Sequence, residues 1–304
     1  MGPSGAAGLP DLHRHLDGSL RPATVAELGK VVGVVVPSDL AFYAGMGLAE
    51  ALSRFAFTLS LLEHPAAVRR VASEICEDAA AEGVHTLEIR FAPQLHRGAS
   101  PEVIIDAALE GIDGRAGLIL CALYGEDPAS VEALVRLAKP RSGVVGLDLA
   151  GGPAPGHHWK MADYVRPFQL AAELGLGRTV HAGEGRPPAE IATAILALGA
   201  NRIGHGTTLL EDQTVLDLVL ERAVTVEACI RSNVHVGAIP SAVAHPLPLW
   251  LNLGVRACIC TDNTLLSQTD APTEHALAAS LPGMTPQLMA LAVKHGHVAA
   301  FQRE

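Results

Sequence analysis

The chain has 304 residues, of which 49% are hydrophobic and 18% are charged, and its formal net charge is −10 at pH 7. This acidic balance, without any basic run, argues against a nucleic-acid partner. No stretch approaches 18 consecutive apolar residues, so we expect no membrane-spanning segment. The composition suits a large, well-covered core, and the charge balance favours a small-molecule substrate.

The N-terminal segment and the cysteines indicate whether the chain is targeted for secretion and whether its thiols are oxidised. The N-terminal segment MGPSGAAGLPDL has neither a basic region nor an apolar one, so we expect no signal peptide. Five cysteines, an odd number, lie in apolar runs, which predicts reduced, buried thiols in a cytoplasmic protein. Cys258 and Cys260 alternate onto one face of a strand, and we interpret them as core residues.

Short apolar runs alternate along the chain with longer amphipathic stretches. The short runs predict eight strands, at Leu9–Leu12, His85–Phe91, Gly117–Leu123, Val144–Leu149, Arg178–Val180, Arg202–Ile203, Thr225–Ala228 and Val255–Cys260. The stretches between them predict helices such as Ala66–Glu82, Pro101–Ile112, Pro128–Leu137, Met161–Glu173, Pro187–Leu198 and Asp212–Glu221. This α/β alternation predicts a (β/α)8 TIM-type barrel of parallel strands, forming a single domain over residues 1–304.

The connection after the first strand, approximately residues 19–65, is much longer than the others. Within it, Leu48–Leu62 has helical periodicity and places Leu48, Leu52 and Phe55 on one face. One interpretation is a packing helix. The other is a lid over the barrel mouth, since long connections in compact domains are usually functional.

Polar side chains follow several strands at their carboxyl ends, where a barrel presents its active site. In HRHLDG, His13 and His15 are two residues apart, so they point the same way along a strand and can bind one ion. The corresponding residues after the later strands are His181 and Glu184 in HAGE after the fifth, His205 after the sixth, and Asp262 after the eighth. Nitrogen and oxygen ligands together suit Zn²⁺ with a position left open for water.

These segments, in this order, resemble the adenosine deaminase branch of the amidohydrolase superfamily. The resemblance rests on HLDG after HxH, then HAGE, RIGHG and the TD pair after the eighth strand. The segments DLAG at 148–151 and EACIRSN at 227–233 are similar to the family's as well. It covers the chain from about residue 10 to residue 270.

The resemblance implies a zinc-dependent hydrolase that replaces the amino group of a purine nucleoside by oxygen. It implies one zinc per chain, with the ligands His13, His15, His181 and Asp262. It also implies two catalytic residues, Glu184 beside purine N1 and His205 beside the water. The substrate contacts that it implies are Asp17 for a ribose hydroxyl, Gly151 for N3, Asn263 beside the ring, and Leu48, Leu52 and Phe55 in an apolar lid.

Elementary chemistry accounts for the same residue types. Zinc lowers the pKa of bound water from about 15.7 to about 7, which provides a nucleophile at neutral pH. Attack on the ring disrupts aromaticity unless the neighbouring nitrogen is protonated at the same time. We therefore expect Glu184 to carry that proton and its pKa to be raised by enclosure. His205 is expected to hold the water, and Asp262 can accept a proton from it.

Three departures from the family's pattern bear on the substrate rather than on the metal site. They are Asn263 in place of a second aspartate, Gly152-Pro153 in place of an acidic pair, and Ala51 in place of a phenylalanine. We expect adenosine or 2′-deoxyadenosine. The alternatives are a 5′-modified adenosine such as 6-aminodeoxyfutalosine, or adenine. AMP is disfavoured because Asp17 would repel a phosphate and Arg14 alternates away from the ligand face.

Two other classes remain open at this point. One is a catalytically silent protein that binds zinc and a purine, which the presence of both Glu184 and His205 disfavours. The other is a hydrolase of cyclic amides or esters. The HxE…PCxxC pattern of cytidine-type deaminases is absent from the sequence. Arg90 and Gln94 are possible substrate contacts, although the sequence gives them no firm role. We interpret the remaining histidines as surface or core residues, such as His64, His85, His157, His158, His245 and His295. His96 and His235 could lie near the mouth, but we do not expect either to bind the metal.

Overall fold

The computed structural model describes residues 8–302. Part of the N-terminal segment in which we expect no signal peptide, residues 1–7, therefore lies outside the described residues. Within the described part of the chain, no helix has both the length and the apolar character that crossing a membrane requires.

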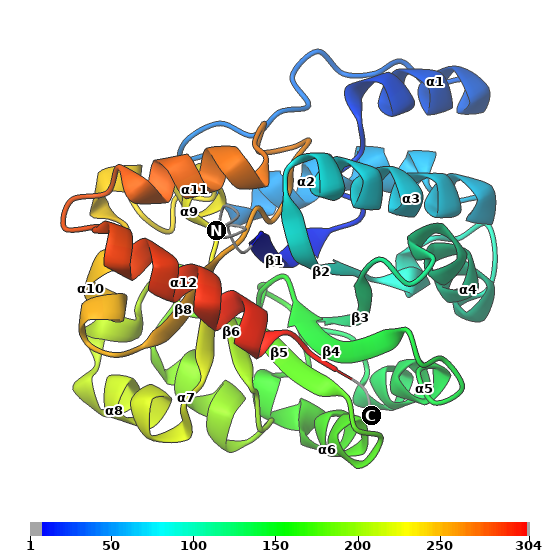
Figure 1. Cartoon of the computed structure of the whole chain (residues 1–304). Helices are drawn as coiled ribbons and strands as arrows, with labels where there is room; N and C mark the ends of the chain where they lie inside the picture. Colours follow the sequence, from blue (N-terminus) through cyan, green and yellow to red (C-terminus); the bar gives the residue numbers. More distant parts are fainter. Residues whose placement is uncertain (1–7, 303–304) are drawn as a thin grey trace, which may run out of the picture.

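Eight parallel strands follow one another around the sheet in chain order, each hydrogen-bonded to the next. The strands are β1 (Leu9–His15), β2 (Val84–Phe91), β3 (Gly117–Leu123), β4 (Val144–Ala150), β5 (Gly177–Ala182), β6 (Arg202–His205), β7 (Thr225–Ala228) and β8 (Arg256–Ile259). Helices connect them (Figure 1). The predicted (β/α)8 barrel is confirmed.

The helices that cover the barrel are α3 (Pro65–Ala81), α4 (Pro101–Ile112), α5 (Pro128–Leu137), α6 (Val165–Glu173), α7 (Ala189–Leu196), α8 (Gln213–Arg222), α10 (Leu247–Asn252) and α12 (Pro286–Ala299). Four further helices lie in the connections that follow β1, β7 and β8: α1 (Pro22–Val32), α2 (Leu48–Leu61), α9 (Ile230–His235) and α11 (Ala271–Ala279). Single turns of 3₁₀ helix occur at η1 (Pro93–Leu95), η2 (Met161–Tyr164), η3 (Leu209–Glu211) and η4 (Ala242–Ala244).

The observed bounds differ from the predicted ones where polar residues continue a strand. β1 runs on through His15, β5 through Ala182 and β6 through His205, so the histidines lie within strands rather than after them. The predicted helix over residues 161–173 is divided into η2 and α6. The other predicted helices agree within two residues at each end.

The barrel closes between β1 and β8 through a single bridge rather than a continuous ladder. The His15 N–H donates to the Asp262 carbonyl at 2.8 Å, and the Asp262 N–H donates to the His13 carbonyl at 2.7 Å. Helix α12 packs on both strands, and a Cβ on its Gly296 would lie 2.4 Å from Pro10. The seam of the barrel thus lies at residues that were predicted to bind the metal.

The opposite end of the barrel is covered by Phe301. Its ring lies 3.6 Å from the guanidinium of Arg202, which also donates to Glu88. A Cβ on Gly177, at the start of β5, would lie 2.1 Å from the same ring, so glycine is required there for the close approach.

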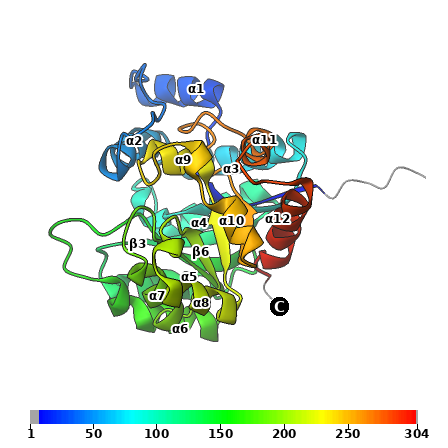
Figure 2. The same cartoon turned by 90° about the vertical axis from the view of Figure 1, so that its left-hand side faces the viewer.

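The long connection after β1 carries α1 and α2. Two views place these helices together with α9 and α11 in the upper part of the molecule (Figures 1 and 2). Phe42, Met46 and Ala51 of this connection form an apolar cluster with Leu266, which follows β8. The insertion therefore packs on the loop after β8 through this cluster, while Leu20, Val25 and Leu61 join it to the main core.

Candidate active site

A cavity of about 370 Å³ opens among the residues that follow the carboxyl ends of the strands. Its lining includes every residue that the sequence predicted for the site except His13, which is fully buried beside it. These residues come from β1, β4, β5, β6 and β8, their following loops and α2. The fold therefore brings the predicted site together.

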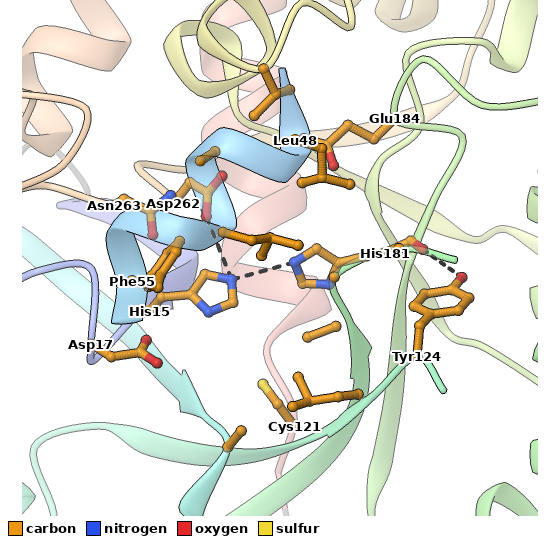
Figure 3. Close-up of a pocket in the computed structure, with 18 of the residues that line it drawn as sticks. His15, Asp17, Leu48, Phe55, Cys121, Tyr124, His181, Glu184, Asp262 and Asn263 are labelled. Atoms are coloured by element: carbon orange, nitrogen blue, oxygen red, sulfur yellow. Dashed lines mark hydrogen bonds and ion pairs between the residues drawn. The ribbon is translucent and has the colours of Figure 1, made fainter. Parts of the chain in front are cut away.

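Four donor atoms converge at the cavity floor. The Nε2 atom of His15 lies 3.3 Å from Nε2 of His13 and 3.3 Å from Nε2 of His181. Oδ1 of Asp262 lies 3.6 Å from Nε2 of His13 and 3.5 Å from Nε2 of His15. Figure 3 shows the His15 ring between Asp262 and His181. Zinc bonds of 2.0–2.1 Å in a tetrahedron place ligand atoms about 3.3 Å apart.

The protonation of two of the histidines also suits a metal, whereas the pKa of the third, His181, is raised by Asp148 although burial acts in the other direction. Burial lowers the pKa of both His13 and His15, and neighbouring positive groups add to the effect. Both rings are therefore held neutral, which is the form that binds a metal. Three imidazole nitrogens and one carboxylate oxygen at these separations fit a divalent ion such as zinc.

Buried carboxylates orient two of the histidines from behind. Nδ1 of His13 lies 2.7 Å from Oε2 of Glu227, and Nδ1 of His181 lies 3.1 Å from Oδ1 of Asp148. A proton on Nδ1 leaves Nε2 of each ring free to bind a metal. Although burial alone acts in the other direction, His181 and Arg90 hold the pKa of Asp148 well below its usual range.

Arg90 joins the two carboxylates and does not contact the cavity. Its guanidinium donates to Asp148 and to Glu227, each at 2.9 Å, and to the Leu12 carbonyl at 2.6 Å. The side chain is fully buried. Arg90, a possible substrate contact from the sequence, instead neutralises the buried acids that orient the histidines. Gln94 donates to Glu126 and to the Cys121 carbonyl.

Two of the site residues have a left-handed backbone. His205 has φ 70° and Asp262 has φ 63°, values that are uncommon for residues other than glycine. The bonds of the barrel seam hold Asp262 in this conformation from both its N–H and its carbonyl. A Cβ on Gly204, next to His205, would lie 3.0 Å from the His13 ring. Such conformations persist where the surroundings enforce them, and they concentrate at functional sites.

Glu184 is buried, and Figure 3 shows it on the opposite side of the pocket from Asp17. Its Oε1 lies 3.4 Å from Nδ1 of His205 and 3.5 Å from the amide nitrogen of Asn233. Burial raises the pKa of Glu184, as expected for a group that delivers a proton.

His205 is held by a chain of side chains that the sequence did not reveal. Asn233 donates from Nδ2 to Nδ1 of His205 at 3.0 Å, and its Oδ1 accepts from Nε2 of His245 at 3.4 Å. Nδ1 of His205 is therefore an acceptor, which places the proton of the neutral ring on Nε2. Burial lowers the pKa of His205 to about 3. The only signal for Asn233 was its place in the EACIRSN segment.

The end of the cavity near β1 and β8 presents unpaired polar atoms. Oδ1 of Asp17 and Oδ1 of Asn263 are both buried without a hydrogen-bond partner. A Cβ on Gly18 would lie 2.2 Å from Oδ1 of Asn263, so this oxygen lies against the chain at Gly18. Burial raises the pKa of Asp17 to about 7. Gly151 has φ 76° and nothing within 4 Å of a would-be Cβ.

The apolar part of the lining comes from the insertion. Leu48, Leu52 and Phe55 of α2 line the cavity, and the Phe55 ring lies 6.1 Å from the His15 ring. Leu52 is 45% exposed, which places it at the mouth, whereas Ala51 is buried. Among the described residues that line the cavity there is no lysine or arginine, and His157 of the loop after β4 also lines it.

Comparisons with known proteins point to one family. A family profile described as adenosine deaminase matches residues 9–304. An adenosine deaminase of Serratia proteamaculans is 34% identical, over 97% of this chain and 94% of that protein. A crystal structure of an Arabidopsis N6-mAMP deaminase has a TM-score of 0.86 at 28% identity, over 98% of this chain and 95% of that one. A crystal structure of an adenine deaminase from Arthrobacter aurescens has a TM-score of 0.75 at 25% identity, over 96% of this chain and 99% of that one.

Proposed function

Because the chain belongs to the adenosine deaminase family of hydrolytic aminohydrolases, we propose that it deaminates an N6-amino purine nucleoside with the help of one zinc ion. Adenosine and 2′-deoxyadenosine are the first candidates, and the products are the corresponding inosines and ammonia. The observation that carries this choice is the character of the cavity. It offers an unpaired Asp17 oxygen for a sugar hydroxyl and no lysine or arginine for a phosphate.

We assign the metal to His13, His15, His181 and Asp262, whose donor atoms converge. When bound, zinc supplies Lewis-acid activation that makes water a nucleophile at neutral pH. The other side chains have unequal roles, which follow from their surroundings.

Glu184 acts as the proton donor to purine N1. Because burial raises its pKa, the carboxyl keeps its proton until the substrate is in place. Protonation of N1 takes up the electron pair that water attack at C6 displaces from the ring. His205, with its proton on Nε2, hydrogen-bonds the attacking oxygen and the negative charge that develops there. The attacking water gives up a proton, for which the Asp262 carboxylate is the acceptor, and this proton passes on to the amino group at C6. The C6–N bond then breaks, ammonia leaves, and the ring regains its conjugation.

The remaining residues position the substrate. Gly151 offers a backbone N–H to N3 without a side chain in the way. Asn263 also lines the cavity, and its amide can donate an N–H to N7. A neutral hydrogen bond of this kind contributes about 1 kcal/mol, so an asparagine is compatible with an adenine ring. Leu48, Leu52 and Phe55 act as a lid whose apolar side chains exclude bulk water from the site.

The comparisons leave three kinds of substrate to distinguish, because the named relatives act on a nucleoside, a nucleotide and a free base. The nucleotide is disfavoured because a phosphate would enter a cavity without a cationic side chain and with the Asp17 carboxylate nearby. The free base is disfavoured because it would leave the Asp17 oxygen without a partner.

A second candidate is an adenosine with a larger 5′ substituent. The observation that favours it is Ala51, which lines the cavity from α2 with only a methyl group. Its small side chain leaves room beside Phe42 and Phe55 where a larger residue would fill the cavity.

The deciding experiment measures ammonia release and kcat/KM for adenosine, 2′-deoxyadenosine, a 5′-substituted adenosine, adenine and AMP. We expect the nucleosides to be preferred and the chelator-treated enzyme to be inactive. The variant Glu184→Gln serves as the matched control, since it should keep the metal yet lose about 10²-fold in kcat. A preference for adenine or AMP over every nucleoside would contradict the substrate assignment. Binding of adenosine without release of ammonia would instead indicate a silent binding protein.

A further inference from the structure

Arg186 follows Glu184 by two residues and is held firmly beside the cavity. Its Nε donates to Oε2 of Glu190 at 2.7 Å, and its Nη2 donates to the His181 carbonyl at 3.1 Å. The guanidinium lies 5.8 Å from the centre of the Tyr124 ring. These three contacts come from α7, β5 and the residue after β3, so the position of the guanidinium is fixed from several sides.

One nitrogen of this guanidinium has no hydrogen-bond partner. Nη1 is buried and unpaired, and it lies 3.8 Å from Oε2 of Glu184. A Cβ on Gly152 would lie 2.8 Å from the same nitrogen, so the glycine there leaves the space that Nη1 occupies. The unpaired nitrogen of Arg186 thus lies close to the general acid, with Gly152 of the loop after β4 beside it.

The charge of Glu184 changes during the proposed reaction. When the carboxyl gives its proton to N1, the O–H bond breaks, the N1–H bond forms, and the electron pair remains on the carboxylate. A fixed positive charge 3.8 Å away interacts little with the neutral acid and strongly with the carboxylate. Since both groups are largely removed from water, solvent weakens this difference less than at a surface.

We propose that Arg186 is a positioning residue for catalysis, which stabilises the carboxylate of Glu184 as its proton passes to the substrate. This proposal rests on the proposed function, because it requires Glu184 to be the proton donor. A purely structural role is the competing explanation, since the Glu190 contact also anchors the start of α7. The two explanations differ in whether the effect of Arg186 depends on the charge of Glu184.

A double-mutant cycle separates them. Arg186→Met is made in the unsubstituted enzyme and in Glu184→Gln, and kcat, KM, zinc content and thermal midpoint are measured for adenosine. In the unsubstituted enzyme we expect kcat to fall about 10- to 100-fold with KM changed less than about threefold. In the Glu184→Gln enzyme we expect kcat to change less than about twofold, because an amide never becomes a carboxylate. Arg186→Lys should retain part of the activity.

The matched control is Arg166→Met, which removes an arginine that pairs with Glu173 at 3.0 Å on the exposed side of α6. It should leave kcat unchanged. Equal losses of kcat in both backgrounds would overturn the proposal and indicate a structural role for Arg186. Should the methionine variant not fold, Arg186→Gln gives the same cycle, since its amide can still donate to Glu190. A folded, zinc-loaded enzyme that releases no ammonia from any 6-aminopurine would overturn the proposed function along with this one.

Discussion

Glu227 is the residue whose replacement tests the buried support of the metal site most directly. Its two oxygens accept from Nδ1 of His13 at 2.7 Å, Nη2 of Arg90 at 2.9 Å, Nε of Arg202 at 2.7 Å and Oγ1 of Thr179 at 3.0 Å. Glu227→Gln keeps the shape but turns one oxygen into an N–H donor that faces other donors. Two buried guanidinium groups then lose a charged partner.

Breaking a buried ion pair from one side costs about 3–5 kcal/mol, because the remaining charge is left without compensation. We therefore expect the metal-free Glu227→Gln protein to lose about 3–5 kcal/mol of unfolding free energy. Because His13 also loses the group that fixes its Nδ1 proton, zinc affinity should fall about 10- to 100-fold.

Two measurements check this reasoning. Denaturant unfolding of the metal-free proteins gives the change in stability, and competition with a chelator of known affinity gives the change in zinc binding. Glu221→Gln is the matched control, since the Glu221 side chain is 74% exposed. A metal-free Glu227→Gln protein that unfolds within about 1 kcal/mol of the original and binds zinc equally well would refute the reasoning.

Three further outcomes follow from the site and its surroundings. Burial raises the pKa of Glu274 to about 7 from 4.5, so the folded protein binds a proton that the unfolded chain has released, and stability should fall as pH rises from 4.5 to 7. Glu274→Gln should reduce this loss by up to ~3 kcal/mol, which is checked by measuring the unfolding free energy at pH 5 and at pH 8. An equal change in unfolding free energy between the two pH values for both proteins would contradict this prediction. His181→Ala should lose both zinc and turnover, and full zinc occupancy by elemental analysis would exclude His181 as a ligand. His205→Ala should keep its zinc while kcat falls about 10²-fold or more, so an unchanged kcat would exclude its role.

The sequence was sufficient for the barrel because its strands are continuously apolar and separated by helical stretches. It was also sufficient for the convergence of His13, His15, His181 and Asp262, since strand ends of a parallel barrel meet at one mouth. The ends of several strands were placed too early because a histidine interrupts the apolar pattern without interrupting the strand.

The support beneath the site could not be predicted from local pattern. Arg90 lies in the largely apolar strand β2 and Glu227 in the largely apolar strand β7, and the two residues are 137 positions apart in the chain. Only the closed barrel shows that they pair, and only that pairing explains why a charged side chain is fully buried in each strand. The link from His205 through Asn233 to His245 is hidden for the same reason, because it joins the end of β6 to two separate points of the long connection between β7 and β8.

The seam between β1 and β8 has a consequence for how the protein is made. Asp11 and Thr261, which hydrogen-bond across this seam beside the donor atoms, are 250 positions apart. A chain emerging from the ribosome therefore presents His13, His15 and His181 long before Asp262 is available to complete the set. Contacts between such distant parts of a chain form slowly. The fourth donor reaches the other three only when the last strand joins the first, so full metal binding would mark the completion of the barrel during biosynthesis.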